Sequence, residues 1–160
     1  MRRFRQSAAE GFTFLELIVV TAIMMILASA ALPIARVSMK RQREADLRYN
    51  MREIRKAIDL FKDYADRQML ASTELSAGCE NYPPSLDVLV EGAILANDAT
   101  GKRKKFLRRI PLDPLTGSTD WGKRSYADAP DSKVWGGGCV FDVYTKYEGK
   151  ALDGSKYKDW

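Results

Sequence analysis

The sequence predicts an α+β fold, in which one long amino-terminal helix packs on a small antiparallel sheet and ends in a carboxy-terminal loop. Three observations predict it. Residues 12–32 are mostly apolar and carry a single charge, on Glu16. Apolar residues then recur at steps of three and four from Leu47 to Ala65, which is the helical period. Residues 140–147 alternate between apolar and polar side chains, as in a half-buried strand.

The apolar run is long enough to cross a lipid bilayer. Its 21 residues cover about 30 Å as a helix, the thickness of one hydrocarbon core. Basic residues flank it, three of them before residue 6 and more over 36–43. They suit anionic headgroups better than a nucleic-acid groove, so we expect no nucleic-acid partner. The first segment usually sets orientation, which predicts a single-pass protein with a cytoplasmic amino end.

Two residues of the run have more than one interpretation. Glu16 carries a charge that is costly in lipid unless it finds a partner there. It lies only about one turn from the membrane edge, so its side chain has the alternative of reaching the headgroups. Pro33 either ends the span or introduces a local kink or melted turn.

The helix is expected to continue beyond the apolar run, from about Phe12 to Met69. Oppositely charged residues spaced for pairing, such as Glu44 with Arg48, decorate its other faces. A coiled-coil dimer is the competing interpretation of the apolar stripe. Packing against a sheet in the same chain is favoured, because the stripe is short and a turn-rich segment follows it.

The carboxy-terminal half carries turn signals and short strands. Ser85 is expected to cap a short helix over 86–90. Residues 123–127 and 140–147 read as strands, and a third strand is expected near Trp121. Together they predict the small antiparallel sheet.

Composition argues against an enzyme. The chain has a net charge of +5 and contains no histidine, which removes the commonest general base and the usual zinc ligand. Cys79 and Cys139 are too far apart for a metal or redox motif. They are expected to form a disulfide if the domain lies in an oxidising compartment; two buried thiols are the alternative.

Six cations lie within residues 102–109, with Phe106 between them. A phosphate-binding patch is one interpretation. The other is a solvated loop that faces lipid headgroups or acidic neighbours.

The amino-terminal residues resemble the signature of type IV pilins and pseudopilins: a basic leader that ends at Gly11, then Phe12, a glutamate at Glu16 and an aliphatic run to Pro33. The resemblance implies cleavage by prepilin peptidase between Gly11 and Phe12, and methylation of the new amino group on Phe12. In a helical fibre, Glu16 of one subunit would pair with the Phe12 amine of its neighbour.

The resemblance also implies a division of the chain. Residues 1–11 would be the leader, 12–35 the transmembrane and polymerisation helix, and 36–70 its amphipathic half. Residues 71–160 would form the periplasmic part, with a connecting segment, the small sheet and the carboxy-terminal loop.

The last third of the chain is similar to the major pseudopilin of type II secretion systems, through the stretches DPLTG and FDVYTK and the terminal DW. In that family the terminal loop holds calcium, which is the one cofactor expected here; its ligands would be Glu148, Asp153 and Asp159. Lys156 and Lys158 depart from the family pattern. A loop free of ions and held by Trp160 is the alternative.

The function expected from this resemblance is structural. The chain would be a pseudopilin of the bacterial inner membrane, surrounded by lipid before assembly, whose carboxy-terminal domain lies in the periplasm. It would polymerise with its own copies and with minor pseudopilins, after contact with prepilin peptidase and an inner-membrane assembly platform. The alternatives are a type IV pilin for adhesion, motility or DNA uptake, and a membrane-tethered binding domain that never polymerises.

Overall fold

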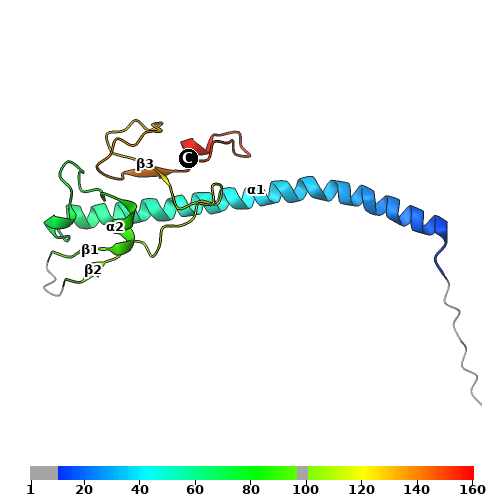
Figure 1. The fold of residues 1–160 in the computed structure, drawn as a ribbon, viewed down its shortest axis with the longest axis horizontal. Coiled ribbons are helices and arrows are strands. Elements are labelled where there is room, and N and C mark those ends of the chain that lie inside the picture. Colours follow the sequence, from blue (N-terminus) through cyan, green and yellow to red (C-terminus); the bar gives the residue numbers. More distant parts are fainter. Residues whose placement is uncertain (1–10, 97–100) are drawn as a thin grey trace, which may run out of the picture. The chain divides into compact units, whose positions relative to one another are not determined.

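The computed structural model describes residues 11–96 and 101–160. The chain divides into two compact units, one up to Lys40 and one from Arg41 onward, which we call the head. The leader up to residue 10, with its basic residues, lies outside the described part. In the described part, one long helix supplies most of the regular structure and two small sheets belong to the head (Figure 1). The predicted α+β class is confirmed.

Helix α1 spans Phe14–Asp66, slightly less than predicted at both ends. It begins late because the Thr13 hydroxyl accepts a hydrogen bond from the backbone N–H of Glu16 at 3.2 Å, as a capping residue does. It ends early because Gln68 adopts a φ of 54°, in the left-handed region. The Met69 N–H then bonds back to the Tyr64 carbonyl and closes the last turn.

Pro33 lies inside α1, which continues through it without a break. The interpretation that a turn melts at Pro33 is therefore wrong for this structure, whereas the interpretation that the membrane span ends there stays a prediction. Proline has no backbone N–H, so the Ser29 carbonyl loses its usual helical donor at this point.

The predicted apolar stripe forms the helical side of the head core. Its members are all buried: Leu47, Met51, Ile54, Ile58, Phe61 and Ala65. They belong to one cluster with Leu89, Trp121 and Val143 from the rest of the head. Burial of each large side chain contributes about 1.5–3 kcal/mol. Because the same chain covers the stripe, packing within the chain is confirmed over a coiled-coil dimer.

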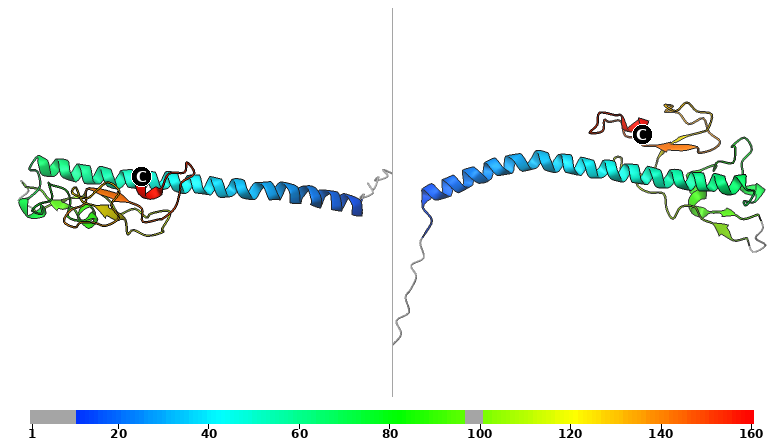
Figure 2. Two further views of the ribbon diagram at one scale, coloured as in Figure 1. Left: turned by 90° about the horizontal axis from the view of Figure 1, so that it is seen from above. Right: turned by 180° about the vertical axis from the view of Figure 1, so that it is seen from behind.

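The head contains two antiparallel pairs instead of the single sheet predicted. Strand β1 (Ala93–Ile94) pairs with β2 (Arg103–Lys104), and β3 (Gly122–Arg124) pairs with β4 (Asp142–Tyr144). Figures 1 and 2 show the two pairs at different positions along the carboxy-terminal part of α1. The first pair was not predicted, because β2 lies within the basic segment.

Strand β3 is shorter than the predicted 123–127 because a side chain competes for its backbone. The Asp128 carboxylate accepts the N–H of Ser125 at 2.7 Å and turns the chain away from the sheet. At the other end of β3, the Tyr144 ring covers Gly122 so closely that a Cβ atom there would clash with it.

Helix α2 (Leu86–Glu91) falls where a short helix was predicted. Gly92 ends it with a φ of 91°, a conformation that favours glycine. Ser85 occupies the N-cap position, but its side chain makes no capping hydrogen bond, which corrects the predicted cap.

Two short 3-10 helices, η1 (Ser72–Glu74) and η2 (Tyr157–Asp159), complete the elements. Cys79 and Cys139 are joined in a disulfide with 5.4 Å between their Cα atoms. The bond connects the segment after α1 to the start of β4. It closes a loop of 60 residues, which on the chain-entropy view contributes about 4 kcal/mol.

Candidate functional site

The bond between Gly11 and Phe12 lies in a short non-helical segment. Residues 11–13 precede α1 and are exposed. A Cβ atom on Gly11 would meet nothing within 4 Å, so packing among the described residues does not require glycine there. A peptidase that needs an extended substrate finds this bond outside the helix.

Glu16 lies in the first turn of α1, two residues after the helix begins. A carboxylate is favoured there, because the unpaired N–H groups at a helix start carry partial positive charge. The side chain is exposed, and no cation of the described chain lies within ion-pair distance of it. A cation that pairs with the Glu16 carboxylate must therefore come from outside the described residues.

Thr13 is the residue at this site that the sequence analysis missed. Thr13 and Glu16 stand three positions apart at a helix start, which is the spacing of a capping box. That spacing, directly before an apolar run, was the sequence signal that would have predicted Thr13 as the helix cap. The cap fixes where α1 begins, and so keeps Phe12 outside the helix.

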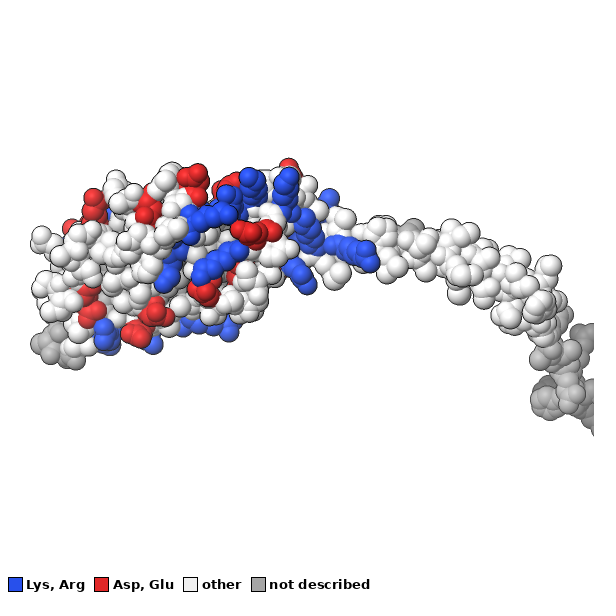
Figure 3. All heavy atoms as spheres, turned by 45° about the horizontal axis from the view of Figure 1, so that its top comes forward, with Lys and Arg blue, Asp and Glu red and all other residues white. Residues whose placement is uncertain are grey.

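The apolar part of α1 presents side chains to its surroundings on every face. The large apolar side chains are exposed along the helix, from 40% for Val20 to 79% for Phe14. The hydroxyls of Thr21 and Ser29 bond to carbonyls three residues back, at 3.0 and 2.7 Å, and so need no water. By length and composition this helix is able to cross a membrane. Figure 3 shows the largely uncharged surface of this part of the helix.

The class of protein follows from the helix and its start. An exposed apolar helix with a capped first turn leads into a small α+β head, which is a pilin-like architecture. Residues 6–32 match the family model of the prokaryotic N-terminal methylation motif. The chain therefore carries a type IV pilin-like prepilin signal.

The match covers the signal and the apolar helix only. No curated protein and no solved structure matches the chain. The helix is compatible with a single membrane anchor.

The three carboxylates predicted to bind calcium do not form a metal site in this structure. Glu148 pairs with Lys133 at 3.1 Å, and Asp153 pairs with Arg48 at 3.4 Å. Across the described residues, no three Asp, Glu, Cys or His side chains gather closely enough to hold a metal ion. Calcium prefers six or more oxygen ligands, so the arrangement does not fit it.

Side chains of α1 hold the carboxy-terminal loop instead. The Glu44 carboxylate accepts hydrogen bonds from the Tyr157 hydroxyl at 2.8 Å and from the Leu152 N–H at 2.9 Å. The Arg48 guanidinium lies over the Trp160 ring, 3.9 Å from its centre. Glu44 and Arg48 were predicted to pair with each other along the helix, but both reach the loop. The interpretation of a loop held by Trp160 fits these contacts.

Arg55 forms the strongest of these attachments. Its guanidinium donates to both carboxylate oxygens of Asp142, at 2.6 and 3.2 Å, and to the Trp160 main-chain oxygen at 2.8 Å. Arg124, which is itself buried, reaches the same Asp142 at 3.5 Å. One side chain of the helix thus connects α1 to β4 and to the loop.

The Tyr157 hydroxyl makes the loop sensitive to alkali. Burial, and then the hydrogen bond to the Glu44 carboxylate, raises the pKa of Tyr157 far above its ordinary value. The folded protein therefore keeps this proton at pH values where the unfolded chain loses it. The stabilisation is complete below about pH 10 and is lost as the pH rises through the folded pKa.

We expect wild-type stability to fall as the pH rises above about 10, and Tyr157→Phe to flatten that fall. The urea midpoint of the full chain, followed by tryptophan fluorescence, measures it. Tyr49→Phe alters an exposed tyrosine of α1 and should keep the wild-type fall. An equal fall in wild type and Tyr157→Phe would contradict the assignment.

The basic segment 102–109 is only partly free in the structure. The Phe106 ring packs edge-on against Phe61 and Tyr64, with ring centres 5.3 and 5.6 Å apart. It is therefore unavailable to stack on a ligand. Arg103 pairs with Glu74 at 3.1 Å. The arrangement favours the interpretation of a solvated loop over that of a phosphate-binding patch.

Proposed function

We propose that this chain is a pseudopilin, a structural subunit that polymerises into a periplasmic fibre for type II protein secretion. The observation that carries the proposal is the methylation motif at residues 6–32, on an apolar helix exposed along its length. A helix of this kind is stable in lipid or against other helices. During assembly the helix would leave the lipid and pack against the helices of other subunits.

In this proposal the chain carries out no chemistry of its own. Prepilin peptidase would cut after Gly11, and Phe12 would receive a methyl group on its new amine. Subunits would then leave the inner membrane at an assembly platform, together with minor pseudopilins. Glu16, which has no cation partner in its own described chain, would pair with the Phe12 amine of a neighbour.

A type IV pilin is the second candidate, since the same signal serves both classes. The placement of the disulfide favours the pseudopilin. Type IV pilins often have a loop at the carboxyl end that is closed by a disulfide. Here the bond runs from Cys79 to Cys139, and the last 20 residues contain no cysteine. Side chains of α1 hold that final segment instead.

Mass spectrometry of the protein from its native membrane tests the proposed processing. We expect a chain that begins at Phe12 and is heavier by one methyl group. Cells that lack prepilin peptidase provide the matched control, and there the chain should begin at Met1. A chain that begins at Met1 in peptidase-competent cells would overturn the proposal.

A further inference from the structure

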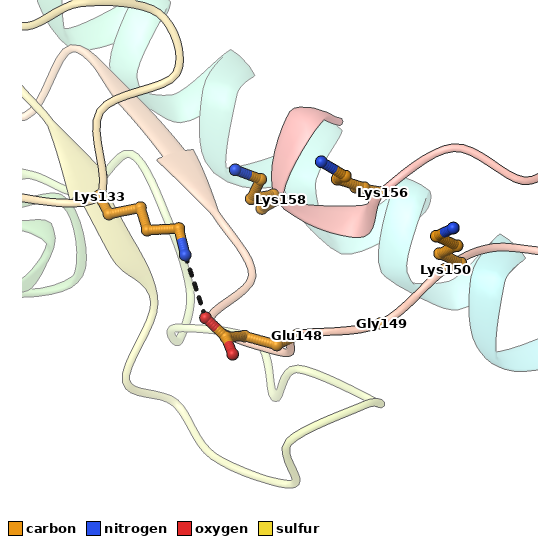
Figure 4. Close-up of a pocket in the computed structure, with 6 residues that line it drawn as sticks. All are labelled: Lys133, Glu148, Gly149, Lys150, Lys156 and Lys158. Carbon is orange, nitrogen blue, oxygen red and sulfur yellow. Dashed lines mark hydrogen bonds and ion pairs between the residues drawn. The ribbon is translucent and has the colours of Figure 1, made fainter.

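We propose that the carboxy-terminal loop contains a binding site for a multivalent oxyanion of the phosphate class. Four lysines and one glutamate line an open cavity of about 390 Å³ on the head: Lys133, Lys150, Lys156, Lys158 and Glu148. Figure 4 shows Lys158 in η2, Lys156 directly before it, and Lys150 on the neighbouring segment. The inference concerns the head alone and does not depend on whether the chain forms a fibre.

The charge of the cavity is strongly one-sided. Among the described residues that line it, Glu148 is the one carboxylate, and it already pairs with Lys133. Within the described chain, no carboxylate lies within ion-pair distance of the amino groups of Lys156 and Lys158. A second cavity adjoins the first and shares Lys133, Lys158 and Glu148; its further lysine, Lys146, pairs with Asp120. The lysines therefore create a local positive field that attracts anions.

The backbone brings two of the lysines together. Lys150 and Lys156 form an antiparallel bridge, so they lie directly opposite each other. Side chains in such a pair stand about 5 Å apart at Cβ. One anion is therefore within reach of both side chains.

The surrounding contacts hold the loop in the shape that creates the cavity. The Ala151 N–H bonds to the Ser155 carbonyl at 2.8 Å, which closes the turn between the paired lysines. Trp160 donates from its indole to the Ser155 hydroxyl at 2.7 Å. The attachments to Glu44 and Arg48 then fix this turn to α1. Because the loop is already held in this shape, the binding of an anion would cost little free energy for ordering it.

The cavity chemistry selects an oxyanion over a metal cation. Four ammonium groups repel calcium, and one carboxylate supplies too few ligands for it. Lysine ammonium groups are point charges with three donors each, which suit phosphate oxygens from several directions. The volume admits a group the size of a diphosphate.

Thermal unfolding of the full chain in nanodiscs of neutral lipid tests the site, with inorganic pyrophosphate as the probe in metal-free buffer. We expect pyrophosphate to raise the unfolding temperature of the wild type. Lys156→Gln/Lys158→Gln should weaken the apparent affinity at least tenfold. Lys102→Gln/Lys105→Gln removes the same charge from exposed positions elsewhere and should bind as the wild type does.

A second readout separates loss of the site from loss of the fold. Without pyrophosphate, Lys156→Gln/Lys158→Gln should unfold at the same temperature as the wild type, because neither ammonium group has an ion pair to lose within the described chain. The proposal is overturned if pyrophosphate does not stabilise the wild type, or if both double variants weaken binding equally. It is also overturned if calcium stabilises the wild type and pyrophosphate does not.

The phosphate group has two sources, a soluble anion or a lipid headgroup, and nanodiscs that contain phosphatidylglycerol distinguish them. If headgroups occupy the site, the wild type should unfold at a higher temperature in these discs than in neutral ones, whereas Lys156→Gln/Lys158→Gln should not. If the ligand is soluble, both proteins should respond equally to the lipid. The first result identifies a lipid headgroup as the ligand, and the second, together with stabilisation by pyrophosphate, identifies a soluble anion.

Discussion

Replacing Glu16 with alanine is expected to abolish fibre assembly and to leave the protein in the membrane. The side chain lies at the start of an apolar helix, where a charge is costly and no cation of the described chain neutralises it. Removing it makes insertion into lipid easier. It also removes the proposed partner of the Phe12 amine, which would then be buried without a counter-charge in the fibre.

Electron microscopy and shearing assays measure the fibres, and membrane fractionation measures insertion. Glu16→Gln keeps the shape of the side chain without its charge and should fail to assemble as Glu16→Ala does. Glu16→Asp keeps the charge and should retain some assembly. The mass of each variant shows whether it was processed, which separates a failure of cleavage from a failure of assembly. Normal fibres from Glu16→Ala would refute the pairing.

Replacing Arg55 with alanine is expected to destabilise the head by about 2 kcal/mol. Breaking a fully buried pair costs about 3–5 kcal/mol, and exposed pairs contribute under about 1 kcal/mol. Arg55 and Asp142 lie between these limits, with side chains 35% and 22% exposed. Without Arg55, only Arg124 at 3.5 Å would remain beside the Asp142 carboxylate.

Urea unfolding of the full chain measures this effect, because all three tryptophans, Trp121, Trp135 and Trp160, belong to the head. Arg55→Lys should fall between wild type and Arg55→Ala, since an ammonium cannot bind a carboxylate through two parallel bonds. Arg67→Ala breaks an exposed pair with Asp63 on the same helix and should cost under about 0.5 kcal/mol. Equal midpoints for Arg55→Ala and Arg67→Ala would contradict the role given to Arg55.

The long helix was predictable because its signals are local. The apolar residues from Leu47 to Ala65 repeat with the helical period, and burial of that stripe follows directly from it. The processing signal was equally readable, since Gly11, Phe12 and Glu16 lie close together in the sequence. Both depend on neighbours within a few residues.

The strands and the loop were less predictable because their partners lie far away in the sequence. Strand β3 ends where Asp128 takes the N–H of Ser125, a bond that competes with the sheet. Glu44 lies 108 residues before Leu152, to which it bonds. Spacing along the helix indicated Arg48 as its partner instead. Phe106 was read as a ring among cations, whereas the fold packs it against the core.

The capped start of α1 has a consequence for the order of events. If the peptidase cuts before Phe12, the new ammonium group lies just outside the Thr13 cap, at the positive end of the helix dipole. Each matured subunit would therefore have an unfavourable interaction between its terminal ammonium group and the helix dipole. The precursor lacks this interaction, because a neutral peptide bond occupies that position before cleavage. A carboxylate from the next subunit would relieve it. Cleavage would thus add a positive charge irreversibly. After it, the separate subunit would have a higher free energy than the assembled one.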